Sequence, residues 1–461
     1  MSRELSSKRW PPLSSGRFAT ALLASLCLAA EAAEQPKAIF HHAPKPLAPN
    51  TAASDWPRFL GPAHNASSPE TKLLKEWPKE GLPVVWELEK GKGWACPAIS
   101  GERLVLFHRV GDHEVVDCLR AADGERLWHV EYDAPYRDRY GASDGPRTSP
   151  VIADGRVFTF GVTGLLHCLE LATGKIVWQR DLARELQMEL NFFGHGSTPL
   201  VLGNRLIINV GAKDNLCVVA LDTATGKQLW GARHEWGASY ASPIPATLHG
   251  RECVLVFAGG ESRPPTGGLL TIDANTGEVL NATPHRADIA ESVNASSPVV
   301  IGNRVFVTES YGSGGEMIEI APDFSAKSAW KADKFGAYFM TPVVKDGVIY
   351  GFDGQSPRLA ELVAHDVASG KELWRDDLGG KFGRGSLLAV DGAHLALGEF
   401  GELLRLDLSR DGVKVLQRAK LFHAPETWTL PALSRGLLYV CQNDRSADGK
   451  PARLICYDLR E

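Results

Sequence analysis

The chain has 461 residues, of which 44% are hydrophobic and 23% are charged, and its formal net charge is −5. These values are ordinary for a globular protein and supply enough apolar side chains for a large core. The sequence contains no basic run, which argues against a nucleic-acid partner and against electrostatic binding to a membrane.

Residues 1–32 are predicted to be a signal peptide. Basic residues precede an apolar stretch at 18–30, and the small-x-small sequence at 30–32 fits a cleavage site. The alternatives are an uncleaved anchor and a lipoprotein modified at Cys27, although the residue before this cysteine is a leucine instead of a small one. No apolar stretch is long enough to predict an integral membrane span. We therefore expect an exported protein, either periplasmic or associated with the cell envelope.

Residues 33–54 are rich in Ala, Pro and His, which predicts a flexible linker. Residues 55–83 are predicted to be an N-terminal extended segment. The repeats that follow occupy residues 84–461.

One pattern recurs through these repeats, a strand that opens with small or hydroxyl residues and a proline. The proline, or the residue in its place, gives each repeat an anchor, and the anchors are positions 97, 150, 199, 243, 298, 342, 387 and 431. Their spacing of 44 to 55 residues is that of a four-stranded propeller blade. Several first strands end in Asp-Gly or Gly-Asn pairs, which favour tight hairpins. The sequence therefore predicts an all-β fold, an eight-bladed β-propeller of four-stranded antiparallel blades.

The outer half of each blade carries a second motif. Residues 220–230 read A-x-D-x-x-T-G-K-x-x-W, and several other repeats match with changes. The Gly suits the turn between strands, and the Trp can pack against a neighbouring blade. Asn281 and Leu416 stand where two blades would have this Trp.

The ends of the repeat region complement each other. The last repeat stops after Leu459 without an outer strand, whereas residues 84–88, around Trp86, resemble an outer strand with nothing before it. We predict that this N-terminal strand completes the eighth blade and closes the ring, which removes exposed sheet edges.

These motifs resemble the PQQ-like (pyrroloquinoline-quinone-like) repeat family over residues 84–461. The family includes quinoprotein dehydrogenases and the propeller lipoprotein of the outer-membrane β-barrel assembly machinery. Residues 55–62 also look like the opening of exported, uncharacterised propellers. The resemblance implies the fold but does not settle the function.

The propeller topology separates two faces. The turns on one face are uniformly short, whereas the loops on the other face are long and irregular, which marks the long-loop face as the candidate binding surface. The residues three or four before each anchor should enter the mouth of the central channel on this face. The candidate ligand-binding residues among them are Trp94, Arg147, His195, Tyr240, Asn294, Tyr338, Phe339, Arg384 and Trp428.

Aromatic residues and Arg are common anchors in binding sites, so this group could hold an acidic planar ligand or an extended peptide. The alternative is that bulky side chains merely pack the channel. The quinoprotein dehydrogenases typically have adjacent cysteines, a catalytic Asp and Ca²⁺ ligands at their cofactor. This sequence has no adjacent cysteines and no carboxylate cluster of the kind that a Ca²⁺ loop needs.

Seven cysteines follow the predicted signal peptide. Three of them occupy one repeat position that Ala or Thr fills elsewhere, which favours buried core thiols over disulfides. The seven are Cys96, Cys118, Cys168, Cys217, Cys253, Cys441 and Cys456.

We therefore favour an exported, monomeric, non-catalytic scaffold that binds a protein segment or polymer of the envelope on its long-loop face. This hypothesis includes no catalytic residue, metal or cofactor. The alternative is a PQQ-dependent oxidoreductase, with PQQ and Ca²⁺ at the channel mouth.

Overall fold

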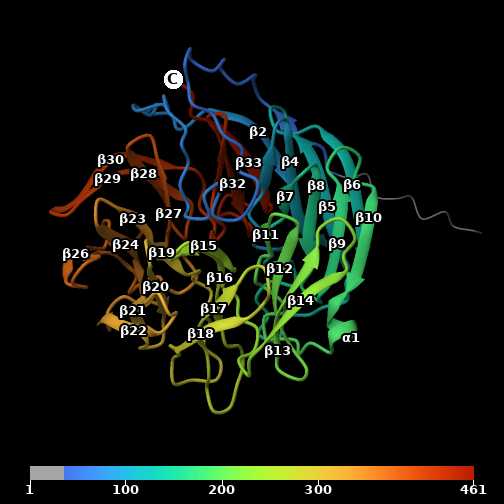
Figure 1. The fold of residues 1–461 in the computed structure, drawn as a ribbon. Helices are drawn as coiled ribbons and strands as arrows, with labels where there is room; N and C mark the ends of the chain where they lie inside the picture. The colour runs from blue at the N-terminus through green and yellow to red at the C-terminus, as the bar shows by residue number, and fades with distance from the viewer. Residues whose placement is uncertain (1–35) are drawn as a thin grey trace, which may run out of the picture. The chain divides into compact units, whose positions relative to one another are not determined.

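The computed structural model describes residues 36–461, which form eight β-sheets arranged around a centre (Figure 1). The predicted signal peptide, residues 1–32, lies outside the described residues. Each sheet is antiparallel, and in seven of the eight the strands follow the chain from the inner strand to the outer strand. The predicted eight-bladed β-propeller is confirmed. No helix in the described part of the chain is long and apolar enough to cross a membrane.

The first four blades are consecutive in the chain. Blade 1 has β3 (Ala98–Ser100), β4 (Arg103–Val110), β5 (His113–Arg120) and β6 (Arg126–Asp133). Blade 2 has β7 (Val151–Ala153), β8 (Arg156–Phe160), β9 (Leu165–Glu170) and β10 (Ile176–Asp181), followed by the short helix α1 (Leu182–Leu186). Blade 3 has β11 (Leu200–Leu202), β12 (Arg205–Ala212), β13 (Leu216–Asp222) and β14 (Gln228–Arg233). Blade 4 has β15 (Ile244–Leu248), β16 (Arg251–Ala258), β17 (Gly268–Asp273) and β18 (Val279–Pro284).

The remaining blades continue the pattern until the chain ends. Blade 5 has β19 (Val299–Ile301), β20 (Arg304–Glu309), β21 (Gly314–Ile320) and β22 (Ala326–Ala332). Blade 6 has β23 (Val343–Lys345), β24 (Val348–Asp353), β25 (Glu361–Asp366) and β26 (Glu372–Asp376). Blade 7 has β27 (Ser386–Val390), β28 (Ala393–Leu397), β29 (Glu402–Ser409) and β30 (Gly412–Lys420). Blade 8 has β31 (Ala432–Ser434), β32 (Leu437–Gln442) and β33 (Arg453–Asp458), completed by N-terminal strands.

The strand β2 (Val84–Glu89) closes the ring as predicted. It pairs with β33, with Trp86 opposite Cys456. The two-residue strand β1 (Ile39–Phe40) then pairs with β2, so this blade has five strands and not the expected four. Part of the segment expected as a linker is thus paired with a sheet. Its composition did not reveal this, because the pairing uses backbone groups at the free edge of β2.

Neighbouring blades are joined by a repeated hydrogen bond. Six outer-strand tryptophans each donate their indole N–H to a backbone carbonyl of the next blade, at 2.9 to 3.1 Å. The pairs are Trp86 to Ala121, Trp128 to Leu171, Trp178 to Thr223, Trp230 to Ala274, Trp330 to Val367 and Trp374 to Ser409. The predicted contact between the motif Trp and a neighbouring blade is therefore present at these junctions.

The two junctions without this Trp use other donors. After Asn281, the imidazole Nε2–H of His249 donates to the carbonyl of Ile320 at 2.8 Å. After Leu416, the backbone N–H of Leu74 donates to the carbonyl of Leu459 at 2.6 Å. All eight junctions therefore present a donor to the corresponding carbonyl.

The hydroxyl-Pro anchors form a second connection, around the channel. The hydroxyl before an anchor accepts a hydrogen bond from the backbone N–H at the equivalent position of the preceding blade. The acceptors, at 2.9 to 3.1 Å, are Ser149, Thr198, Ser242, Ser297 and Thr341. This contact explains why small hydroxyl residues recur at the start of the blades.

Residues 55–83 contact the inner strands of several blades, or the turns that follow those strands. Trp56 forms a bridge with Ile99 of β3, and Ser67 forms one with Ala389 of β27. The buried carboxylate of Glu70 accepts the backbone N–H groups of the turn between β31 and β32, at 2.6 and 2.7 Å. This segment therefore ties blades 1, 7 and 8 together.

All seven cysteines in residues 36–461 are free and buried. The interpretation of these residues as core thiols is confirmed.

We predict that Gly174→Ala destabilises the protein more than Gly155→Ala does. Both glycines have positive φ, +74° and +69°, so each alanine has about 1 kcal/mol of backbone strain. At Gly174 the new Cβ would also lie 2.7 Å from the Trp128 ring, whereas at Gly155 it meets nothing within 4 Å. Overpacking should add about 1–3 kcal/mol at Gly174 alone. Urea midpoints of both variants measure the difference, and equal midpoints would contradict it.

Candidate functional site

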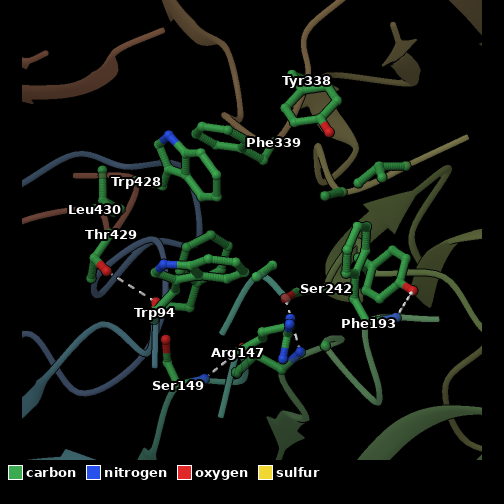
Figure 2. A pocket seen from close by; sticks show the side chains of 17 residues that line it. Trp94, Arg147, Ser149, Phe193, Ser242, Tyr338, Phe339, Trp428, Thr429 and Leu430 are labelled. Atoms are coloured by element: carbon green, nitrogen blue, oxygen red, sulfur yellow. Dashed lines mark hydrogen bonds between the residues drawn. The ribbon is translucent and has the colours of Figure 1, made fainter. Parts of the chain in front are cut away.

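A cavity of about 190 Å³ opens at the centre of the long-loop face, where the blade-to-blade connections enter the inner strands. We call it the aromatic cup because seven aromatic side chains line it: Phe59, Trp94, Phe193, Tyr240, Tyr338, Phe339 and Trp428. Figure 2 shows the lining side chains arranged around an open centre. Hydroxyl and small side chains complete the lining.

Six of the nine candidate residues line the cup, namely Trp94, Arg147, Tyr240, Tyr338, Phe339 and Trp428. Arg384 lies behind the aromatic wall. His195 and Asn294 are buried and are not part of the lining. Both are four residues before their anchors, but Tyr338 is equally far from its own anchor and does line the cup, so this position alone does not decide where the side chain points. The structure thus brings most of the candidates together, while ligand binding by them stays a prediction.

One wall of the cup is a chain of aromatic contacts. The ring centroids of Trp94 and Trp428 are 4.8 Å apart, and those of Trp428 and Phe339 are 5.2 Å apart. Tyr338 continues the row at 5.3 Å from Phe339. The Arg384 guanidinium lies 5.0 to 5.5 Å from the Tyr338, Phe339 and Trp428 rings, a cation–π arrangement that fixes the wall.

The opposite wall comes from the connections that follow blades 2 and 3. Phe193 packs against Tyr240 at 5.9 Å, and the Tyr240 hydroxyl accepts the Phe193 backbone N–H at 3.1 Å. The Arg147 guanidinium contacts both walls, since it lies 4.8 Å from the centre of the Trp94 ring and 5.6 Å from the centre of the Phe193 ring.

Phe59 and Phe193 are the aromatic lining residues that the sequence reasoning missed. Phe193 lies six residues before its anchor, beyond the positions considered, but the pair Phe192-Phe193 in a blade-to-blade connection is a usable signal. Phe59 comes from the N-terminal segment, and no repeat position predicts its place.

The positive charges of the two arginines are neutralised by carboxylates of the protein itself. Arg147 pairs with the fully buried carboxylate of Asp138 at 2.8 Å, and it also donates to two backbone carbonyls. Burial lowers the pKa of Arg147. Arg384 forms a two-pronged ion pair with Glu399, which also accepts the Trp428 indole N–H at 3.0 Å. The cup therefore presents a mainly apolar surface with little net charge.

Three hydroxyls add polarity to the lining. Ser149, Thr198 and Ser242 each use their oxygen to accept a backbone N–H from the preceding blade. A hydroxyl has one hydrogen of its own to donate. These three hydrogens can therefore serve a carbonyl or hydroxyl acceptor in the cup.

PQQ with Ca²⁺ does not fit these residues. The quinone carries several carboxylates and so needs cations, but both arginines at the cup already face acids of the protein. Ca²⁺ needs a group of oxygen ligands, and the described residues contain no group of three His, Cys, Asp or Glu that could hold a metal.

The fold and the central cup define a β-propeller built from PQQ-like repeats. A family model described as outer membrane protein assembly factor BamB matches residues 112–362, more than half of the chain. The chain belongs to this family.

A relative is similar to this chain in sequence, and solved structures are similar to it in fold. The chain is 26% identical over 326 residues to the outer membrane protein assembly factor BamB of Burkholderia pseudomallei, covering 67% of this chain and 72% of the relative. A BamB structure from Moraxella catarrhalis has a TM-score of 0.55 and 16% identity, with 82% and 97% of the two chains covered. A quinohemoprotein alcohol dehydrogenase from Comamonas testosteroni has a TM-score of 0.62 and 14% identity, with 89% and 81% covered. At these identities the structures show the fold alone.

We predict that the protein loses stability as the pH falls from about 6.5 to about 4. Burial lowers the pKa of His167, His195 and His394 to about 4. The unfolded chain therefore binds more protons than the folded one in this range, at a cost of up to about 1.4 kcal/mol per pH unit for each histidine. His195→Phe should reduce the pH dependence of the urea midpoint. An unchanged dependence would show that this imidazole is not neutral and buried.

Proposed function

We propose that the protein is a non-catalytic scaffold of the cell envelope that binds an extended protein segment on its long-loop face. In this proposal an apolar side chain of the segment inserts into the aromatic cup. The observation that carries the proposal is the cup itself, a concave aromatic surface whose arginines are paired with acids of the protein. The similarity to relatives named as outer membrane protein assembly factors supports a role in the envelope.

The lining of the cup suits a peptide. Buried aromatic pockets are typical anchors of protein interfaces, because they desolvate one large side chain of the partner. The hydroxyls of Ser149, Thr198 and Ser242 can donate to a peptide carbonyl. An extended segment can lie across the channel mouth, where the blade-to-blade connections meet. The cup suits an acidic planar ligand less well, because Arg147 and Arg384 are already paired with carboxylates of the protein.

The alternative function, a PQQ-dependent oxidoreductase, has less support. The chain is 27% identical over 157 residues to the quinohemoprotein alcohol dehydrogenase ADH-IIG of Pseudomonas putida, but this covers only 21% of that enzyme. The cup residues do not fit the quinone and its Ca²⁺. We therefore favour the scaffold, acting as a monomer.

We predict that Trp428→Ala weakens peptide binding about tenfold or more, because the loss of a central aromatic anchor usually costs at least that much. Peptides are selected from a random display library against the immobilised protein, and the affinities of the selected peptides are then measured by fluorescence anisotropy. The selected sequences should share a large apolar residue.

The control is Leu359→Ala, because this side chain is 72% exposed in a long loop and does not line the cup. It should leave the affinity unchanged. Equal affinities of wild type and Trp428→Ala, with both proteins folded by circular dichroism, would refute the proposed site.

A further inference from the structure

A second hollow, of about 620 Å³, lies beside the cup between blades 8 and 1. We call it the basic groove, because its charged lining residues are five cations and three acids. They are Lys90, Lys92, Arg109, Arg137, Arg445, Asp112, Asp144 and Asp444. The excess of positive charge is local, since the whole chain has a net charge of −5.

The acids of the groove do not neutralise all of its cations. Asp144 pairs with Lys92 at 2.9 Å. Asp112 is shared between Arg137 at 2.8 Å and the buried Arg109 at 3.3 Å.

Two cations of the groove remain without a carboxylate partner in the part of the chain that the structure describes. The buried Lys90 donates to the carbonyls of Gly91 and Gly93, at 3.2 and 3.1 Å. Arg445 is exposed and donates to the carbonyl of Gly449. In this respect the groove differs from the cup, whose arginines both face acids.

The groove and the cup share a wall. Asn443, which lines the groove, donates its amide to the Thr429 hydroxyl at 3.0 Å. Thr429 lines the cup and donates to the backbone carbonyl of Trp94 at 3.1 Å (Figure 2). Lys92 is two residues before Trp94. At about 3.3 Å per residue, an extended segment that leaves the cup past Trp94 enters the groove within a few residues.

We infer that the basic groove binds acidic side chains of the same segment whose apolar side chain fills the cup. The inference rests on the proposed function and adds the chemistry of the partner. That partner is an extended protein segment with a large apolar residue and, a few residues away, Asp or Glu.

The exposure of the cations helps to place these acids. Arg137 and Arg445 are exposed, whereas Lys90 and Arg109 are buried. Acids of the segment would therefore lie beside Arg137 and Arg445.

The test uses three short synthetic peptides that share one Trp and differ in their flanking residues, which are Asp, Asn or Lys. Their affinities for the full chain are measured by fluorescence anisotropy at low and high salt. We expect the Asp peptide to bind about fivefold more tightly than the Asn peptide at low salt, with the advantage lost at about 0.5 M salt. The Lys peptide should bind most weakly.

The double variant Arg137→Gln/Arg445→Gln should remove the preference for the Asp peptide over the Asn peptide. The matched control is Arg184→Gln, because the side chain of Arg184 is 84% exposed and lies on α1, away from both hollows. It should retain the preference.

The outcomes separate the two proposals. If the Asn and Asp peptides bind equally and both depend on Trp428, the inference about the groove is wrong and the cup stands. If no peptide binding depends on Trp428, the proposed function fails and the inference fails with it. If inorganic polyphosphate, which has no apolar group, competes with the Asp peptide and binds equally well to Trp428→Ala, the groove is a polyanion site and the inference is overturned.

Discussion

The structure depends on one interaction, the hydrogen bond that the same carbonyl of each blade accepts at its junction with the preceding blade. A buried hydrogen bond of this kind contributes only about 1 kcal/mol, but here it comes with a tryptophan ring that covers the neighbouring turn and excludes water from it. The glycine in that turn is required by this contact: in blade 2 the Cβ of any other residue would lie 2.7 Å from the Trp128 ring. Because Trp86 makes the same bond from β2, the ring closes with the same contact that joins its consecutive blades.

The two junctions without tryptophan show which part of this interaction the fold requires. His249 supplies its imidazole N–H, and Leu74 supplies a backbone N–H from the N-terminal segment. Both junctions therefore keep a hydrogen-bond donor although they lack the tryptophan ring. At the last junction the N-terminal segment has a structural role, since it completes a contact that blade 7 cannot make with Leu416.

The repeat pattern carried most of the information about the fold. Proline and hydroxyl residues predicted the inner strands because their positions are set by local contacts that recur in each blade, and Trp86 could be assigned to blade 8 by the same periodicity. The fifth strand β1 and the substitution by His249 could not be predicted, because they depend on backbone edges and on partners far apart in the chain. For the site, counting back from the anchors predicted Trp94 and Trp428 at the cup. The same counting included His195 and Asn294, which point into the protein, and it could not reveal Phe59, which belongs to no repeat.

The pairing of charges distinguishes what this propeller can bind from what other members of its fold class can bind. A channel mouth that holds a polyanionic quinone must leave cations free for it, but here Asp138 and Glu399 occupy the two arginines. Those ion pairs make the arginines into supports for the aromatic walls, because a guanidinium held by a carboxylate still stacks on a neighbouring ring. Across the shared wall formed by Thr429 and Asn443, Lys90 and Arg445 have no such partner among the described residues. Similar residue types thus produce an apolar surface in one hollow and a positive surface in the next. A segment that carries both an apolar residue and an acid matches the two surfaces together better than a ligand that offers only one of these features.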